Sequence, residues 1–273
     1  MPINNVESTI LAYHNSNHVK KEIAMEIVLL TALGVGGATV IGAAVGFLFK
    51  NLSHKFYDIV LSFAAGIMLA AAFLGLIVPS LEYGGKYGII TTVAGIFVGA
   101  VCMKLIDVLV PHLHKIADKD IEPHGRNRSI DKVLLFVLAI AIHNFPEGIA
   151  AGVGFGSGNE AEAMVIAIGI ALQNIPEGMV IIAPMLAAGI KPGKTFFYAI
   201  LTGVVEVIGT MLGYFAGASA VILPFALSFA GGTMLYVISD EMIPETHSHG
   251  SESGATFSLL IGIAVMLVMD FLL

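Results

Sequence analysis

The sequence predicts an all-α polytopic membrane protein with eight transmembrane helices. Hydrophobic residues make up 57% of the chain and charged residues 12%, whereas ordinary globular proteins hold about 45–50% and 25%. The apolar residues lie in eight runs, and each run reaches the roughly 20 residues that a helix needs to cross a bilayer. The chain also holds 31 glycines and no tryptophan, and small residues let helices pack closely in lipid.

Short polar or glycine- and proline-containing segments separate the predicted helices. The eight helices are expected over residues 25–49, 57–81, 88–110, 132–154, 161–188, 195–217, 219–243 and 255–273. Lys50 follows the first helix, Pro79 and Glu82 close the second, and a Gly84-Gly85-Lys86 turn leads to the third. Charges and helix-breaking residues therefore stand where the chain leaves each apolar run.

The later boundaries follow the same rule. The only long polar segment, 111–131, separates the third helix from the fourth, and a Gly/Ser/Asn turn at 156–159 separates the fourth from the fifth. Loops at 189–194 and 244–254 precede the sixth and eighth helices. Residues 1–24 are polar and lack the apolar core and cleavage site of a signal peptide, so they are predicted to form a tail.

The distribution of lysine and arginine predicts the orientation. An even number of helices places both termini on one side, and most basic residues lie in the loops after the first, third and fifth helices. By the positive-inside rule these loops face the cytoplasm and both termini are extracytoplasmic. The sequence thus predicts an extracytoplasmic tail, residues 1–24, and one eight-helix domain, residues 25–273, with a cytoplasmic histidine-containing loop at 111–131.

Several function classes are disfavoured by composition. The net charge of −7 and the lack of a basic patch with interleaved aromatics argue against nucleic acid. The single cysteine, Cys102, permits no internal disulfide. No P-loop pattern is present, so we expect no nucleotide.

Two similar polar words interrupt apolar helices and predict a functional site. The fourth helix contains His143-Asn-Phe-Pro-Glu147-Gly, and the fifth contains Gln173-Asn-Ile-Pro-Glu177-Gly. A charged side chain near the middle of a bilayer costs roughly 2.5–3.5 kcal/mol on insertion scales. One copy could be a helix start, with Asn as N-cap and Pro in the first turn. Two mid-span copies favour a site instead.

The residue types in these words predict a metal site. Residues four apart share a helix face, so His143 lies over Glu147 and Gln173 over Glu177. Each motif proline leaves a backbone carbonyl without its usual donor. Sequential helices run antiparallel, so the two words can meet near mid-membrane. Imidazole, carboxylate and amide oxygens together suit a first-row divalent cation such as zinc.

Other polar residues extend the candidate site. Glu206, in the middle of the sixth helix, is expected to face it, with an interhelical hydrogen bond as the alternative. Met68 is by default a core residue. A possible ion pathway comprises acids and histidines at the helix ends: Asp107, His112, His114, Asp240 and Glu241 on the cytoplasmic side, and Glu82 and Asp270 at the opposite mouth. Solvated side chains are the alternative reading for these.

The paired motifs resemble the ZIP (Zrt/Irt-like) family of divalent metal transporters, and its bacterial GufA-like branch in particular. Supporting words are Phe63-Ala-Ala-Gly-x-Met68-Leu and Ser239-Asp240-Glu241-Met-Ile-Pro244-Glu245-Thr246-His247. The resemblance covers roughly residues 25–273. It implies helices grouped as three, two and three, with the outer triplets related by inverted symmetry, and a homodimer in the bacterial cytoplasmic membrane.

The resemblance also implies a function and a ligand set. Family members carry zinc, and variously cadmium, iron or manganese, into the cytoplasm and use no organic cofactor. The implied two-metal centre uses His143, Asn144, Glu147, Gln173, Asn174, Glu177, Glu206 and Met68. Asn174 stands where some members have Asp, which removes an acid; the expected consequence is a weaker second metal or an altered selectivity. Asp240 stands where some have His.

Two other function classes are weighed. A sodium/calcium-type exchanger also uses Asn-x-x-Pro-Glu-like intramembrane repeats, but its repeats lie in separate halves of a ten-helix chain. Calcium moreover prefers all-oxygen ligands, whereas this site holds histidine. An intramembrane metallohydrolase is disfavoured because the His-Glu-x-x-His word is absent. The sequence therefore predicts a transporter and not an enzyme.

Overall fold

The structure is a computed structural model, and it describes residues 4–48, 53–109, 128–187 and 189–272. Side chains are described for residues 22–48, 53–106, 141–187 and 189–272. The side chain of Asp107, and the whole of His112 and His114, therefore lie outside the described part of the chain.

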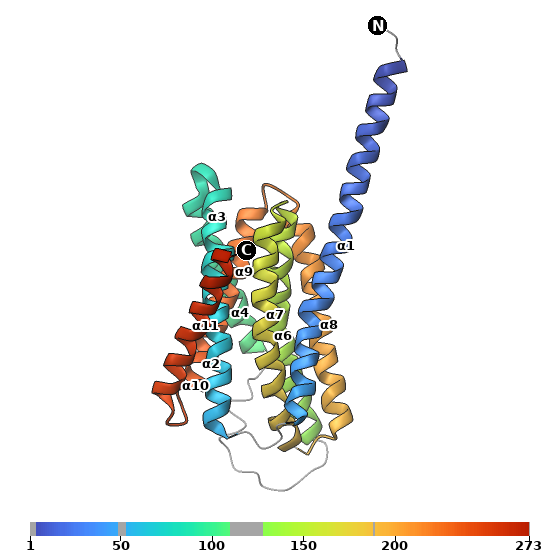
Figure 1. Ribbon diagram of the computed structural model, residues 1–273. Coiled ribbons are helices and arrows are strands. Elements are labelled where there is room, and N and C mark those ends of the chain that lie inside the picture. The colour runs from blue at the N-terminus through green and yellow to red at the C-terminus, as the bar shows by residue number, and fades with distance from the viewer. Residues whose placement is uncertain (1–3, 49–52, 110–127, 188, 273) are drawn as a thin grey trace.

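The described residues form a bundle of eight long helices (Figure 1). Two of them are interrupted by a π-helical segment, and a short 3-10 turn precedes a third. In chain order the elements are α1 (Asn4–Leu48), α2 (His54–Ala71), η1 (Ala72–Ile77), α3 (Val78–Tyr83), η2 (Gly85–Tyr87), α4 (Gly88–Leu109), α6 (Arg128–Gly156), α7 (Glu160–Ala187), α8 (Pro192–Gly217), α9 (Leu223–Val237), η3 (Ile238–Met242), α10 (Ile243–Thr246) and α11 (Glu252–Leu272). Among the residues with described side chains, seven helical segments qualify by length and composition as membrane spans. The predicted all-helical membrane fold is confirmed.

The first helix is longer than predicted. It begins at Asn4, whereas the prediction placed its start at residue 25. The apolar span itself covers Glu22–Leu48, and Figure 1 shows the N-terminal part of α1 projecting beyond the bundle. No glycine or proline occurs between residues 3 and 33, so nothing stops the helix where the polar tail meets the apolar run.

Two helices contain a single π-helical turn, and in each a proline follows after one intervening residue. In η1 the Val78 N–H bonds to the carbonyl of Phe73, and in η3 the Ile243 N–H bonds to that of Ile238. These five-residue hydrogen bonds let the second and seventh helices continue through the prolines that follow. The second helix thus ends at Tyr83, two residues beyond the predicted end at residue 81.

Glycines set the closest helix contacts. The contacts pair α1 with α7 and α8, α6 with α8, α4 with α9, and α2 with α11. A Cβ on Gly36 of α1 would collide with the carbonyl oxygen of Gly203 of α8, and a Cβ on Gly203 would collide with that of Gly36. Close backbone approach of this kind is how small residues hold helices together in lipid.

The same contacts recur in two places along the chain. Gly148 of α6 faces the Glu206 carbonyl of α8, and Gly178 of α7 faces the Thr39 carbonyl of α1 in the same way. The word Phe-Ala-x-Gly-x-Met-Leu also occurs twice, at 63–69 and 229–235. In each copy a π-helical turn begins three residues after the leucine.

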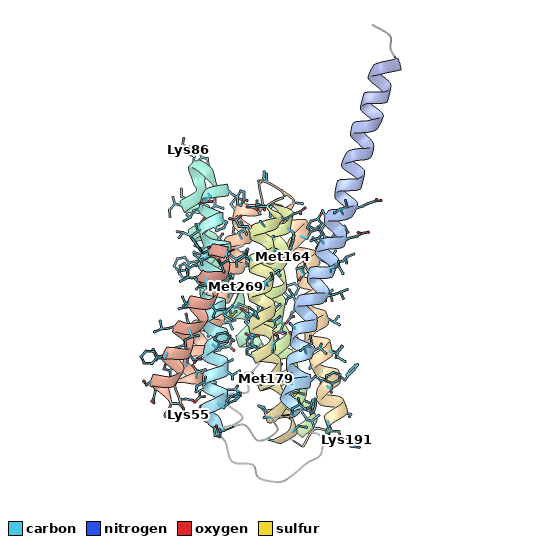
Figure 2. All side chains as sticks on the ribbon, in the orientation of Figure 1. Lys55, Lys86, Met164, Met179, Lys191 and Met269 are labelled. Atoms are coloured by element: carbon cyan, nitrogen blue, oxygen red, sulfur yellow. The ribbon has the colours of Figure 1, made fainter. Side chains whose placement is uncertain are left out.

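The outer surface of the bundle is apolar. Large hydrophobic side chains of α4, such as Ile90 and Phe97 at 67% exposure each, face outward, as expected for helices that contact lipid. Figure 2 shows Lys86 at one end of the bundle and Lys55 and Lys191 at the other. The start of α1 and the end of α11 lie toward the Lys86 end (Figures 1 and 2).

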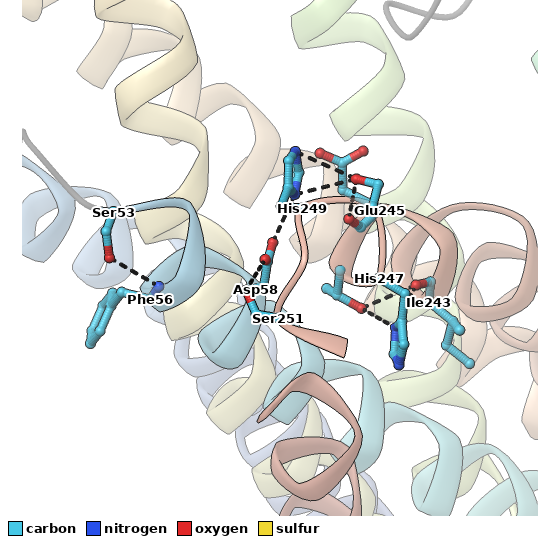
Figure 3. Close-up of polar contacts among 10 residues, drawn as sticks. Ser53, Phe56, Asp58, Ile243, Glu245, His247, His249 and Ser251 are labelled. Carbon is cyan, nitrogen blue, oxygen red and sulfur yellow. Dashed lines mark hydrogen bonds and ion pairs between the residues drawn. The ribbon is translucent and has the colours of Figure 1, made fainter. Parts of the chain in front are cut away.

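A polar cluster fastens the connection between α10 and α11 to the start of α2 (Figure 3). Asp58, which is fully buried, accepts hydrogen bonds from His249 Nδ1 and Ser251 Oγ, each at 3.0 Å. The His249 ring also stacks on that of His54, with centroids 5.0 Å apart. At the first turn of α2 the Ser53 hydroxyl accepts from the Phe56 N–H at 3.3 Å and caps the helix.

Candidate metal centre

The two motif words lie inside the bundle, as predicted. Both helices run through the motif prolines, Pro146 and Pro176, without ending. Asn144 and Glu147 of α6 are 3% and 1% exposed. Gln173 and Asn174 of α7 and Glu206 of α8 are fully buried. Buried polar groups need partners, so their contacts decide what this region can do.

Glu206 joins four helices through hydrogen bonds. Thr39 Oγ1 of α1 donates to Glu206 Oε1 at 2.8 Å, and the Asn144 amide donates to the same oxygen. The Asn174 amide donates to Glu206 Oε2 at 2.9 Å and to the Val35 carbonyl at 3.1 Å. The structure therefore brings Glu206 together with both motif asparagines.

His143 pairs with an acid from the seventh helix. Its Nε2 lies 3.0 Å from Glu241 Oε1, and both side chains are largely buried. The sequence placed Glu241 with Asp240 in a cytoplasmic exit relay. In the structure the two acids separate, because Asp240 is exposed and accepts from the Tyr236 hydroxyl at 3.2 Å. Glu241 is thus part of the motif region.

Several buried oxygens have no hydrogen-bond partner among the described residues. Those in the two motif words are Glu147 Oε2, Gln173 Oε1, Asn174 Oδ1 and Glu177 Oε1. The Glu147 carboxylate lies within electrostatic reach of Glu177 and Glu206, and Glu177 lies within reach of His143. Buried oxygens left unpaired call for an explanation, and an ion or water that binds them is one.

Within the described side chains, His, Cys, Asp and Glu do not make a complete metal site by themselves. Among the residues with described side chains, no three His, Cys, Asp or Glu side chains are grouped so that they could hold an ion. A cation bound here would therefore draw on the amide oxygens of Gln173 and Asn174 as well. Amide and carboxylate oxygens with one imidazole make a mixed donor set, which suits a borderline divalent metal.

Comparison with known proteins places these residues in a family. The family model described as "ZIP Zinc transporter" matches residues 117–270. The chain is 37% identical over 249 residues to the zinc transporter GufA of Myxococcus xanthus, covering 89% of this chain and 97% of that protein. This chain belongs to the ZIP zinc transporter family. It is thus a transporter and not an enzyme, as the sequence predicted.

Other ZIP relatives agree with this assignment. The zinc transporter ZupT of Chlorobaculum parvum is 36% identical and is matched over 90% of this chain and 95% of its own length. The zinc transporter ZIPB of Bordetella bronchiseptica is 33% identical, over 85% of this chain and 77% of that protein. The recognition drawn from the paired motifs is therefore confirmed.

The remaining predicted residues of this ZIP protein lie away from the paired motifs or in the apolar core. Met68 is 1% exposed and belongs to the main hydrophobic core, so its role as a ligand stays a prediction. Glu82, in α3, and Asp270, in α11, are exposed, which fits solvated acids at the end of the bundle.

Sequence reasoning missed Thr39, which contacts Glu206 in this ZIP chain. Threonine in an apolar helix is common, and Thr39 alone gives no signal. A signal does exist in the words that follow: Val-Ile-Gly comes directly after Thr39 and also directly after Glu206. Aligning these two words places Thr39 of the first helix at the position of Glu206 in the sixth.

Proposed function

We propose that this ZIP-family protein carries a divalent transition metal, zinc foremost, into the cytoplasm through a centre on α6 and α7. One observation carries the proposal. The two motif words supply four buried oxygens that lack hydrogen-bond partners among the described residues. In a membrane interior such oxygens are costly, and a passing cation would satisfy them.

The proposed centre draws its ligands from both words. His143 and Glu147 would contribute from α6, and Gln173 and Glu177 from α7. The family resemblance adds the asparagines, Met68 and Glu206 to this region. Mixed amide and carboxylate ligands hold zinc less tightly than a closed thiolate site, as release on the far side requires. Cadmium, iron and manganese have similar ligand preferences and are candidate substrates.

The proposal includes inverted repeats formed by the first three and last three helices. Two kinds of observation support it. Gly36 and Gly203 contact each other reciprocally, and the Gly148 and Gly178 contacts match. The Phe-Ala-x-Gly-x-Met-Leu word recurs in the second and seventh helices before a π-helical turn. Repeats of this kind place a substrate site near the middle of the membrane.

The orientation in the membrane is proposed from the charged residues, and the location and oligomeric state are proposed from the family resemblance. The Lys55 and Lys191 end of the bundle would face the cytoplasm, with both termini and the tail, residues 1–24, outside. The resemblance supports the cytoplasmic membrane of a bacterium and a homodimer. No nucleotide would be needed.

Metal uptake by liposomes that hold the purified protein tests this function. Zinc, cadmium, iron, manganese and calcium are compared for the wild type, His143→Ala, Glu147→Ala and Glu177→Ala. Zinc or cadmium uptake should appear in the wild type and fall at least ten-fold in each variant, roughly the loss that removing a metal-site group causes. Glu160→Ala, which changes an exposed acid in the first turn of α7, is the matched control.

Two outcomes would overturn the proposal. Full uptake in Glu147→Ala or Glu177→Ala would remove the central site. Sodium-dependent, calcium-selective flux would instead support the exchanger.

A further inference from the structure

The carboxylate of Glu206 is engaged by donors from three other helices. Thr39, Asn144 and Asn174 all donate to it, and all four side chains are buried. A carboxylate offers about four acceptor positions. Three donors therefore leave it little capacity to bind a cation.

This network also fixes the direction of an amide. Asn174 Nδ2 donates to Glu206 and to the Val35 carbonyl at 2.9 and 3.1 Å, so both of its hydrogens are used. The oxygen of that amide, Oδ1, is buried and has no hydrogen-bond partner among the described residues. Glu206 thus turns the nitrogen toward itself and leaves the oxygen for the centre.

The Asn144 side-chain amide is oriented by Glu206 in the same way. Its amide nitrogen donates to Glu206, so the oxygen points away from the Glu206 carboxylate. A group that orients a ligand by hydrogen bonding, without touching the metal, commonly tunes a metal site. Glu206 has the geometry of such a group.

Thr39 reaches Glu206 because of how α1 packs on α8. The reciprocal contact of Gly36 with Gly203 brings α1 and α8 together three residues before Thr39 and Glu206 respectively. The Thr39 hydroxyl then lies 2.8 Å from Glu206 Oε1. The neutral Thr39 hydroxyl donates to the Glu206 carboxylate. An ionised acid at position 39 could not donate and would repel that carboxylate.

From these contacts we infer that the centre holds one cation, and that Glu206 and Thr39 are positioning residues that orient the amide oxygens toward it. The inference rests on the proposed function and departs from the two-metal arrangement that the family resemblance implies. The reason is Asn174. An aspartate there would lose the donor to Glu206 and repel its carboxylate, which would free both acids for a second cation.

Metal stoichiometry in lipid nanodiscs tests the inference. Zinc bound at saturation is measured by equilibrium dialysis and elemental analysis. The bound zinc of a Glu147→Ala/Glu177→Ala double variant is subtracted, because it represents sites elsewhere in the chain. The wild type should exceed the double variant by one zinc per chain, and Asn174→Asp should exceed it by two.

Thr39 variants test the positioning role separately. Thr39→Val keeps the shape but removes the donor, and Thr39→Ser keeps the donor. The KM for zinc uptake should rise roughly ten-fold in Thr39→Val, in line with the loss of a group that orients a ligand, with kcat nearly unchanged. Thr39→Ser should restore the wild-type KM. A packing role alone would give the opposite ranking, because valine fills the space better than serine.

The outcomes distinguish failure of the single-cation inference from failure of the proposed function. A wild-type excess of two zinc ions, or an Asn174→Asp excess of one, would overturn the single-cation inference and leave the proposed function intact. Equal KM values in Thr39→Ser and Thr39→Val would overturn the role of the hydroxyl. No wild-type excess over the double variant would overturn the proposed function and this inference together.

Discussion

At the scale of single residues, the pairing of His143 with Glu241 links the motif to the seventh helix. We predict that Glu241→Gln raises the KM for zinc uptake about ten-fold, because the amide pairs more weakly with the imidazole and no longer fixes its orientation. Initial rates of zinc uptake in liposomes, measured over a range of zinc concentrations, give this value.

The neighbouring acid provides the control for this prediction. Asp240 is exposed and contacts Tyr236 instead of His143, so Asp240→Asn should leave the KM unchanged within two-fold. The substitution removes the same charge one position away. Equal effects from the two variants would mean that general acidity near the cytoplasmic end matters, and not the contact with His143.

The paired motifs show how much of the site could be predicted from individual residues. His143, Glu147, Gln173 and Glu177 could be predicted because polar side chains repeated in an apolar helix have few uses other than a site. The division between Asp240 and Glu241 could not be predicted. Adjacent residues on a helix point in directions about 100° apart, and which of the two acids faces His143 depends on how the seventh helix packs in the bundle.

At the scale of helices, the close approach of α1 to α8 depends on Gly36 of α1, which lies against Gly203 of α8. We predict that Gly36→Ala lowers the unfolding temperature of the detergent-solubilised protein, because the new methyl group would collide with the Gly203 carbonyl. Overpacking of this kind costs about 1–3 kcal/mol. Thermal unfolding followed by circular dichroism measures the shift.

Gly37 is the matched control for this helix contact. It is adjacent in the same helix, and a Cβ built on it meets nothing within 4 Å. Gly37→Ala should therefore leave the unfolding temperature unchanged or raise it, since alanine favours a helix over glycine by about 1 kcal/mol. A similar drop in both variants would show that α1 does not approach α8 as described.

The polar cluster at Asp58 is a second helix-scale contact. We predict that Asp58→Asn speeds amide hydrogen exchange in residues 247–256, because an amide cannot accept from both His249 and Ser251 as the carboxylate does. Hydrogen exchange followed by mass spectrometry measures this change. Glu252→Gln, at an exposed position in the first turn of α11, should leave the exchange unchanged. Unaltered exchange in Asp58→Asn would contradict the fastening role.

Helix limits were less predictable than helix number. The eight apolar runs gave the helices because hydrophobic length decides what can cross a bilayer. Polarity does not decide where a helix stops, so α1 continues through the polar tail to Asn4. The second helix ends at Tyr83, close to the predicted residue 81, but its π-helical turn over Ala72–Ile77 was not predicted.

At the scale of the whole molecule, the charges at the two ends of the bundle predict its orientation. Lys86 is exposed at one end, and Lys191 is exposed at the other (Figure 2). The basic loops after the first, third and fifth helices should face the cytoplasm. With Cys102 replaced by serine, a cysteine at position 86 should react with a membrane-impermeant maleimide in intact cells, and one at position 191 should not.

Permeabilised cells supply the control, because both cysteines should then react to the same extent. The reverse pattern would place the Lys191 end outside, and zinc would have to enter the centre from the other direction. Labelling of both positions in intact cells would show two populations of opposite orientation. Such dual insertion is conceivable because Lys20 and Lys21 lie before the first span and oppose the loop charges. A single orientation would mean that the loop charges outweigh these two lysines.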